Sequence, residues 1–397
     1  MAMELRRARS LVAYWVNGEM VLDDYLDRTP ENGEKNGVAV DGAALDILSQ
    51  FDDWTDPEQV SHRFDDYDPA SVLEAVTDLA EAGLLRTRQA AQEEDRILDR
   101  WQAWGQSAQF FHFDTKDTAY ISTEGASADP EIAASRAAVF GEIRASGPAP
   151  EMFARNVDAE RIMLTRSFLP LDRDFADVLL SRRTHRHFTE DAVPLRSFST
   201  VLHYTFAPMH FFDAGVLGKL MLRTSPCGGA RHESECYVAV RNVESIPPGL
   251  YRYSPSDHSL EVLSYDFDTV QLGRLTFDQK MVTTAGFVCF LTIDVQRAMF
   301  KYRSARMLRT VLLDTGHLAQ TFALCATAVG LGPCQTDAFR DSELEAALGV
   351  DGAAETAVYV LAAGVPARRT DGHPIADAPD EVGRRTPQES APQKPAA

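Results

Sequence analysis

The stretch KYRSARMLRTVLLDTGHLAQTFALCATAVGLG, residues 301–332, decides the fold of this chain. It contains no proline, and its apolar residues recur at three- and four-residue spacing, which predicts a long helix buried along much of its surface. The apolar positions are Leu308, Val311, Leu312, Leu318, Ala319, Phe322, Ala326 and Val329. Gly330 and Gly332 are expected to end the helix.

Two groups of polar side chains in this segment are not needed for a packed core helix. Lys301 and Tyr302 place two side chains capable of proton transfer at its start. His317 and Gln320 bring hydrogen-bonding groups into the apolar middle of the predicted helix, where they need partners. The alternative is a core helix without a role in chemistry.

The composition indicates a soluble, cytoplasmic, globular protein. The 397 residues suffice for two domains, 45% of them are hydrophobic, and no apolar run approaches the roughly 20 residues of a membrane-spanning helix. The start of the chain, MAMELRRARSLVAYWVNGEM, lacks the apolar region of a signal peptide. A formal net charge of -20 repels nucleic-acid phosphate. The five cysteines lack CxxC spacing, so we expect reduced thiols, no disulfide framework and no metal site.

The N-terminal part predicts a small module over residues 38–95, after a separate segment of residues 1–37. Helical patterns or helix-start signals occur at 41–51, 56–64 and 69–85, and an extended LLRTR segment follows, which suggests a winged-helix-like fold. The third helix offers acidic residues where a DNA-binding helix offers basic ones, so DNA binding is not expected. Small modules of this shape also bind peptides by adding a strand to a sheet edge.

Residues 96–167 are interpreted as a connection to a second globular region, residues 168–368. The connection includes the end of a charged helix predicted over 89–110 and an exposed loop predicted over 122–150. In the second region, helical patterns interleave irregularly with strands such as CYVAVRNV, GFVCFLTID and TAVYVLAAGV, which favours an α+β sandwich over a doubly wound sheet. The tail, residues 369–397, has the composition of a disordered segment.

Several further segments carry candidate binding residues. The motif SRRTHRHF, residues 181–188, concentrates arginines and a hydroxyl in an acidic chain, which suits an anionic phosphate, although a solvated basic turn has the same composition. Two glycine-containing turns, at 226–229 and 330–332, would leave backbone amides open to a flat ligand. Arg368 and Arg369 follow the last strand as a second possible phosphate contact.

Taken in order, these segments resemble the FMN-dependent nitroreductase superfamily and, more narrowly, its SagB-type peptide dehydrogenases, which oxidise azolines to azoles in ribosomally made peptides. The motifs that carry the resemblance are SRRTHRHF, RTSPCGGARHESECYVAV, PPGLYRYSPSDHSLEVL, KYRSARMLRTVLLDTGHLAQ, AVGLGP and YVLAAGVP. The resemblance implies a nitroreductase-like α/β sandwich with a long central helix. It extends more loosely to the N-terminal module, which looks like the winged-helix peptide-binding domains of these pathways.

The resemblance also implies a role for each candidate residue. The FMN phosphate and ribityl chain would be held by Arg182, Arg183, Thr184 and Arg186, with Arg368 or Arg369 as the second phosphate contact. The turn that lies against the isoalloxazine ring would be Pro226, Cys227, Gly228 and Gly229, although serine is commoner in the family where Cys227 stands. The reactive edge of the flavin would face Gly330, Leu331 and Gly332, and the proton-transfer pair would be Lys301 and Tyr302.

The chemistry of azole formation agrees with these roles. Converting a thiazoline or oxazoline ring to an azole removes one proton and one hydride equivalent, and a flavin accepts only the hydride. A base must take the proton, which suits a lysine in an apolar pocket. The implied partners are a precursor peptide, a cyclodehydratase and a second copy of the chain, because the superfamily shares its active site across a homodimer interface. Two alternatives remain open: a flavin enzyme that oxidises or reduces another peptide side chain, such as a dehydroamino acid, and an inactive peptide-binding scaffold.

Overall fold

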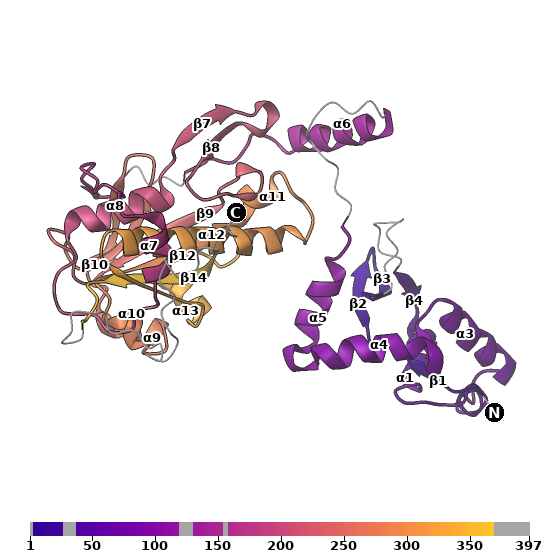
Figure 1. Ribbon diagram of the computed structural model, residues 1–397. Helices are drawn as coiled ribbons and strands as arrows, with labels where there is room; N and C mark the ends of the chain where they lie inside the picture. Colours follow the sequence, from indigo (N-terminus) through magenta and orange to yellow (C-terminus); the bar gives the residue numbers. More distant parts are fainter. Residues whose placement is uncertain (1–2, 27–36, 119–129, 154–157, 369–397) are drawn as a thin grey trace, which may run out of the picture. The chain divides into compact units, whose positions relative to one another are not determined.

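The computed structural model describes residues 3–26, 37–118, 130–153 and 158–368 of the chain. The chain forms two compact units, Met1–Gly125 and Ala126–Ala397 (Figure 1). The tail predicted to be disordered, and Arg369 with it, lies outside the described residues. No helix in the described ranges is long and apolar enough to cross a membrane.

Unit 1 combines two small sheets with a set of helices. Its strands are β1 (Leu5–Arg7), β2 (Leu11–Val16), β3 (Glu19–Asp24), β4 (Val38–Val40) and β5 (Leu85–Thr87). Its helices are α1 (Gly42–Ser49), α2 (Pro57–Ser61), α3 (Pro69–Glu81), α4 (Arg88–Trp101) and α5 (Gly105–Asp114). β1 pairs with β5, and the other three strands form an antiparallel sheet in the order β2-β3-β4.

Local sequence signals explain the elements of unit 1. Asp41 and Asp56 cap α1 and α2 by accepting backbone N–H groups, and Gly83 follows α3 with a positive φ. Asn17 and Gly18, both with positive φ, form the two-residue turn between β2 and β3. The three predicted helices and the extended segment after them are therefore confirmed. The strands β1, β2 and β3 come from residues 5–24, which the sequence analysis had assigned to a separate N-terminal segment.

Unit 2 is built on a seven-stranded sheet in the order β13-β14-β12-β9-β10-β11-β6. Its strands are β6 (Arg161–Met163), β7 (His210–Asp213), β8 (Lys219–Leu222), β9 (Ser234–Val240), β10 (Gly249–Ser254), β11 (Ser259–Ser264), β12 (Phe287–Asp294), β13 (Gly332–Thr336) and β14 (Glu355–Gly364). Its helices are α6 (Pro130–Ala145), α7 (Phe175–Ser181), α8 (Leu195–Phe206), α9 (Thr269–Leu275), α10 (Lys280–Thr283), α11 (Val295–Met299), α12 (Met307–Ala328) and α13 (Asp341–Leu348). β7 and β8 form a separate hairpin.

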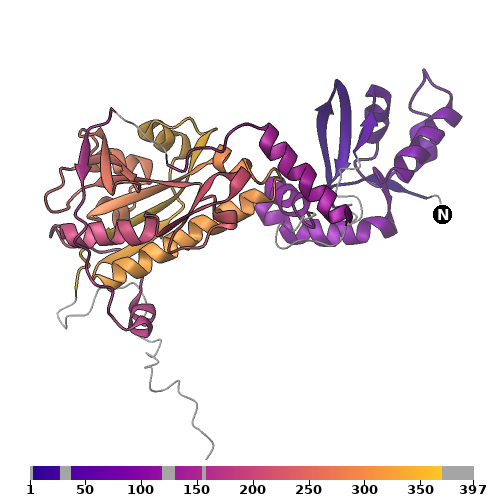
Figure 2. The same cartoon turned by 90° about the horizontal axis from the view of Figure 1, so that it is seen from above.

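Helices cover both faces of the large sheet, so the predicted α+β sandwich is confirmed. The side chains of β9 alternate: Cys236 and Val238 face the core under α8 and α12, whereas Tyr237 and Ala239 face the core under α9, α10 and α13. Figure 2 shows α8 and α12 side by side along one face. Neighbouring strands of this sheet are antiparallel throughout the described residues.

The long helix starts later than predicted, so the expectation of a helix from Lys301 was wrong. α12 begins at Met307, and Lys301 and Tyr302 lie in the connection that follows α11. The reason is Ser304, whose hydroxyl accepts the N–H of Arg306 and whose carbonyl accepts the N–H of Met307. Such local bonds compete with a continuous helix. The connection therefore holds the lysine and the tyrosine in a loop.

The end of α12 agrees with the prediction. Gly330 has a φ of +84°, the N–H of Leu331 donates to the carbonyl of Ala326, and the N–H of Gly330 donates to that of Thr327. This is a Schellman motif, which terminates a helix at a glycine. Gly332 already belongs to β13.

The burial of α12 differs from the prediction on one face. His317 and Gln320, expected inside an apolar environment, are exposed, and so are Leu308 and Leu312, which were expected to be buried. The opposite face is buried as expected, and Phe322 is fully covered. The apolar pattern therefore covers more of the helix than the core of one chain uses.

The expectation of a loop over residues 122–150 was also wrong for part of this range. Residues 130–145 form α6, which begins at Pro130, a residue suited to the first turn of a helix. Ile143 of this helix packs with Leu217 and Phe300 in a small apolar cluster, and Val139 and Phe140 lie against it. Burial of these three side chains stabilises a helix that the Ser/Ala/Pro composition did not predict.

Candidate functional site

The predicted arginine residues come together at one end of unit 2. The N–H of Thr189 donates to the carbonyl of Val365 at 2.9 Å, and the N–H of Ala367 donates to the carbonyl of His187 at 3.0 Å. These bonds place the motif of residues 181–188 beside the end of β14. We use the name arginine cluster for Arg182, Arg183, Arg186 and Arg368.

The pKa of His185 reflects the positive charge of this cluster. Its side chain is buried, and its pKa is lowered by burial and, in decreasing order, by the charges of Arg368, Arg182 and Arg183. Its Nδ1 atom has no hydrogen-bond partner in the described part of the chain. The imidazole is therefore a neutral group inside a region of positive potential.

Arg186, the fourth arginine of the cluster, lies in the same region, beside Cys334. Burial raises the pKa of the Cys334 thiol to about 12, and the charge of Arg186 acts on that thiol in the opposite direction. Arg183 has turned back on its own segment and donates to the carbonyls of Leu180 and Arg182, at 2.8 Å each. Thr184 is half-buried between these residues.

The arginine cluster fits an anionic group. Among the described residues, no carboxylate lies within ion-pair distance of Arg182 or Arg183, so neither positive charge is neutralised by an acid there. Gly332 packs against the ring of His185, and a Cβ at this glycine would lie 2.7 Å from Cγ of the imidazole. The loop of residues 330–332, which was expected at the reactive edge of the flavin, is thereby fixed next to the cluster.

The glycine turn, residues 226–229, lies against the first half of α12. The N–H of Gly228 donates to Oδ2 of Asp314 at 2.8 Å, and the hydroxyls of Ser225 and Thr321 are 2.6 Å apart. Gly229 has a φ of +68°, a conformation that suits glycine. Helix α12 thus fixes both the position and the backbone direction of the turn.

Lys301 and Tyr302 lie directly against this turn. A Cβ at Gly229 would overlap the Tyr302 hydroxyl and would lie 2.9 Å from Nζ of Lys301. Nζ of Lys301 is 4.8 Å from the centre of the Tyr302 ring. Both side chains are half-buried. The structure therefore brings together two segments, 226–229 and 301–302, that are far apart in the sequence.

Helix α6 holds the residues on either side of this pair. Phe300, just before Lys301, is buried against Ile143 of α6. Arg303, just after Tyr302, donates to the hydroxyl of Ser146 and lies 4.0 Å from the carboxylate of Glu142. The position of the lysine and the tyrosine therefore depends on a helix that was not predicted.

Two acidic residues near the turn were missed by the sequence analysis. Asp314 and Glu233 are buried, and both lie close to Cys227. The pKa of Glu233 is raised, chiefly by burial. The pKa of the Cys227 thiol is also raised, by burial first and then by the charges of Glu233 and Asp314. The available signal was weak: Asp314 precedes His317 by three positions on one helix, and Glu233 follows the glycine turn.

The two halves of the predicted site do not meet within one chain. The glycine turn contacts α12 at Thr310 and Asp314, whereas the arginine cluster lies beyond its C-terminal end at Gly332. At about 1.5 Å per residue, the helix separates these regions by about 20 Å. The residues around Lys301 and the residues around Arg182 are thus two distinct regions of one subunit.

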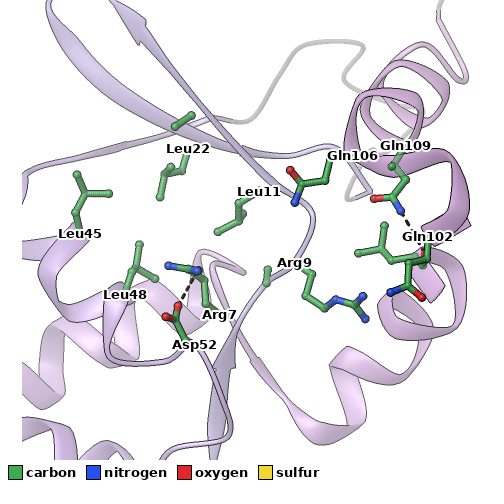
Figure 3. Close-up of a pocket in the computed structure, with 14 residues that line it drawn as sticks. Arg7, Arg9, Leu11, Leu22, Leu45, Leu48, Asp52, Gln102, Gln106 and Gln109 are labelled. Atoms are coloured by element: carbon green, nitrogen blue, oxygen red, sulfur yellow. Dashed lines mark hydrogen bonds and ion pairs between the residues drawn. The ribbon is translucent and has the colours of Figure 1, made fainter.

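Unit 1 contains a pocket of about 590 Å³ (Figure 3). Leu11 and Leu22 line one side together with two leucines of α1, and the side-chain amides of Gln106 and Gln109 lie on the other side. At its edge, the guanidinium of Arg7 is paired with Asp52 at 2.7 Å. Both leucines and polar side chains line the pocket, and they come from β2, α1 and α5 among other elements.

Comparison with known proteins identifies the class of the larger unit. The model of the nitroreductase family matches residues 179–365. A protein of Methanocaldococcus jannaschii described as a putative nitroreductase is 31% identical over 168 residues, which cover 42% of this chain and 80% of that protein. This chain belongs to the nitroreductase family. Members of that family are oxidoreductases that bind flavin.

Two further relatives come from Rhizobium leguminosarum bv. trifolii. The trifolitoxin operon protein TfxC is 24% identical over 315 residues, covering 75% of this chain and 83% of that protein. The trifolitoxin-processing protein TfxB is 29% identical over 162 residues, covering 40% of this chain and 43% of that protein. The similarity to TfxC therefore extends well beyond the residues that the family model matches.

Proposed function

We propose that this protein is an FMN-dependent, SagB-type dehydrogenase that oxidises thiazoline or oxazoline rings in a ribosomally made peptide to azoles. The observation that carries the proposal is the contact of Lys301 and Tyr302 with the turn at Gly229. In this class of enzyme a base and a flavin must face the same substrate ring, and that contact places the base beside a glycine of the turn. The similarity to a trifolitoxin-processing protein supports a peptide substrate.

The residues present fit a flavin mononucleotide. The arginine cluster offers guanidinium groups for the phosphate, and the buried Nδ1 of His185 is an orphaned polar atom beside them. Gly228 and Gly229 offer a surface for the ring without a Cβ, although the N–H of Gly228 is already taken by Asp314. Bound FMN would supply the acceptor for the hydride equivalent that the substrate loses.

Two side chains of the protein would transfer the proton that the substrate ring loses. Lys301 would take a proton from the azoline ring carbon, because its amine lies at the turn where the flavin ring is expected. Tyr302 would orient this amine or carry the proton away, since its ring packs beside Nζ. Molecular oxygen would be the final acceptor: the hydride equivalent and the proton that the substrate loses would together reduce one O2 to hydrogen peroxide.

A homodimer would unite the two halves of the site. The outward face of α12 exposes Leu308, Leu312 and Leu313, which are 45%, 49% and 65% accessible, and Gly316 lies among them at the middle of the helix. Phe175 on the adjacent α7 is exposed as well. Two such helices crossing in antiparallel directions would cover these side chains and place the glycine turn of one chain near the arginine cluster of the other.

Unit 1 would bind the precursor peptide as a winged-helix-like module. β2 is an edge strand, and the two-residue turn at Asn17 and Gly18 fixes which backbone groups pair with β3. By this register, the N–H and C=O groups of Leu11 and Ala13 point away from β3, and both residues line the 590 Å³ pocket. An extended peptide could add to β2 and place an apolar side chain over the leucines.

The cofactor part of the proposal is tested by a visible absorption spectrum of the purified protein and chromatography of the compound released on denaturation. We expect an oxidised flavin spectrum and close to one FMN per subunit. A colourless protein that takes up no added FMN would overturn the enzyme assignment and favour the scaffold alternative. Rapid bleaching by NADPH or NADH would favour a reductase, whereas reoxidation by air without such bleaching favours the proposed oxidase.

The peptide-binding part is tested with Ala13→Pro. Proline removes an N–H that does not take part in the β2–β3 pairing, so the hairpin should keep its fold while strand addition is lost. Fluorescence anisotropy with the labelled precursor peptide should show at least tenfold weaker binding. The matched control Ala13→Val keeps the N–H and should bind normally. Equal affinity of both variants would exclude this edge as the docking site.

A further inference from the structure

Three potential metal ligands converge beneath the glycine turn. They are Sγ of Cys227, the carboxylate of Glu233 and the carboxylate of Asp314, and their ligand atoms all lie within 4.8 Å of one another. Cys227 belongs to the turn, Glu233 directly precedes β9, and Asp314 belongs to α12. We refer to these three residues as the thiol–carboxylate cluster.

Glu233 points to a missing partner in this cluster. Its side chain is 0% exposed, and its Oε1 atom has no hydrogen-bond partner in the described part of the chain. Its other oxygen, Oε2, lies 3.5 Å from Sγ of Cys227. A buried carboxylate oxygen without a donor is unfavourable, so an additional positively charged group is expected at this place.

The carboxylate of Asp314 is held from two sides. Nδ1 of His317 lies 3.5 Å from Oδ1 of Asp314, while Oδ2 of the same carboxylate accepts the N–H of Gly228. These contacts orient the carboxylate in the way that outer contacts orient metal ligands.

We propose that the thiol–carboxylate cluster forms a binding site for a zinc-like divalent cation. Around a tetrahedral zinc ion with bonds of about 2.0–2.3 Å, neighbouring ligand atoms are about 3.4–3.6 Å apart. The Cys227–Glu233 separation of 3.5 Å matches this spacing. A sulfur ligand favours zinc over magnesium or calcium, which prefer oxygen.

The ion would fasten the glycine turn to α12. Cys227 is the only one of the three ligands in the turn itself, and its side chain reaches inward to Glu233 while the backbone of Gly229 lies against Tyr302. The proposal does not depend on azoline chemistry. It also replaces the expectation of no metal site, which rested on the absence of CxxC spacing and could not anticipate ligands from three separate segments.

The test is zinc binding by the full-length protein, produced without an affinity tag. After treatment with a chelator and dialysis, wild type should take up about one zinc per chain by elemental analysis, and added zinc should raise its melting temperature. Glu233→Gln and Cys227→Ala should lower the affinity for zinc at least tenfold. Asp314→Asn, which keeps an oxygen for the N–H of Gly228, should weaken it as well.

Two results would overturn the metal site. One is a chelator-treated wild type that takes up less than a tenth of an equivalent of zinc and shows no thermal shift. The other is zinc retained with wild-type affinity by Glu233→Gln and Asp314→Asn, both verified as folded by circular dichroism, because the ion would then be held elsewhere. His210→Ala, an exposed histidine on β7, is the matched control and should bind zinc like wild type.

Discussion

The Tyr302 hydroxyl lies against Gly229, at the place where any other residue would carry its Cβ. This contact joins the glycine turn to the lysine–tyrosine loop across more than seventy residues of sequence. The site therefore needs glycine at position 229 for two separate reasons. A Cβ would overlap Tyr302, and the positive φ of this residue suits glycine.

Gly229→Ala should therefore lower turnover at least tenfold while the protein stays folded. The added methyl group would displace Tyr302 and Lys301, and the φ of +68° adds a strain of about 1 kcal/mol. Gly349→Ala is the control, because Gly349 has a similar φ of +76° but open space around a Cβ. It should lose the same stability and keep its activity. Equal rates for the two variants would separate Gly229 from the active site.

Lys301→Ala should give a folded, yellow protein with turnover lowered at least about 100-fold, as expected when a general base is removed. The measurement is the rate of azole formation at saturating peptide, together with the flavin content. Lys280→Ala, at an exposed position of α10, is the control and should behave like wild type. A Lys301→Ala enzyme as fast as wild type would show that another group takes the proton.

Arg182→Ala should weaken FMN binding at least tenfold, because one of the guanidinium groups expected to hold the phosphate is lost. Fluorescence titration of the flavin-free protein with FMN measures this effect, and riboflavin, which lacks the phosphate, should bind wild type and variant alike. Arg274→Ala, on the exposed side of α9, is the control. Unchanged FMN affinity of Arg182→Ala would remove Arg182 from the phosphate site.

Gly316→Leu should prevent the proposed dimer from forming and thereby weaken flavin binding. Gly316 lies in the exposed strip of α12 with no atom within 4 Å of an added Cβ, so leucine is compatible with the fold of a single chain and interferes only where a second helix approaches. Light scattering coupled to gel filtration gives the mass. Ala347→Leu, exposed on α13, should remain dimeric. A wild-type monomer that holds FMN would contradict the shared site.

The stability of unit 2 should fall as the pH is lowered from about 6.5 to about 4, because burial and then the charges of His203 and Arg166 lower the pKa of His258 to about 4. Its unfolded pKa is higher, so the unfolded chain binds the proton first and the stability present above pH 6.5 is lost towards pH 4. The shift amounts to about 3 kcal/mol.

Denaturant unfolding between pH 7 and pH 4 measures this dependence. His258→Asn is the comparison, since asparagine tolerates the φ of +58° at this position and does not titrate. The variant should be less stable at neutral pH, because its contacts with Ser199 and Tyr253 change, but its stability should fall less towards pH 4. Parallel curves for both proteins would mean that His258 does not cause the loss.

Much of the fold could be predicted from periodicity and caps. The strands β9, β12 and β14 lie where their patterns placed them, and Gly330 ends α12 as expected. The start of α12 could not be predicted, because the hydroxyl and carbonyl of Ser304 decide it through local hydrogen bonds. Leu308 and Leu312 show a second limit: apolar spacing does not distinguish a buried helix face from an exposed one.

The site was predictable only in its separate segments. The motif at 181–188 and Arg368 were identified independently, and the pairing of residues 187–189 with 365–367 joins them. The contact between Gly229 and Lys301 is a tertiary relationship that no local pattern contains. Asp314 and Glu233 were missed because each is a single acidic residue within an ordinary helix or strand pattern, and only the fold brings them to Cys227.

The central claim is tested most directly by mass spectrometry of an azoline-containing precursor peptide after incubation with the FMN-loaded enzyme in air. The account predicts the loss of two hydrogen atoms for each ring converted, with hydrogen peroxide formed in equal amount, and almost no loss with Lys301→Ala. A yellow, dimeric wild-type enzyme that binds the peptide and leaves every azoline ring unchanged would contradict it.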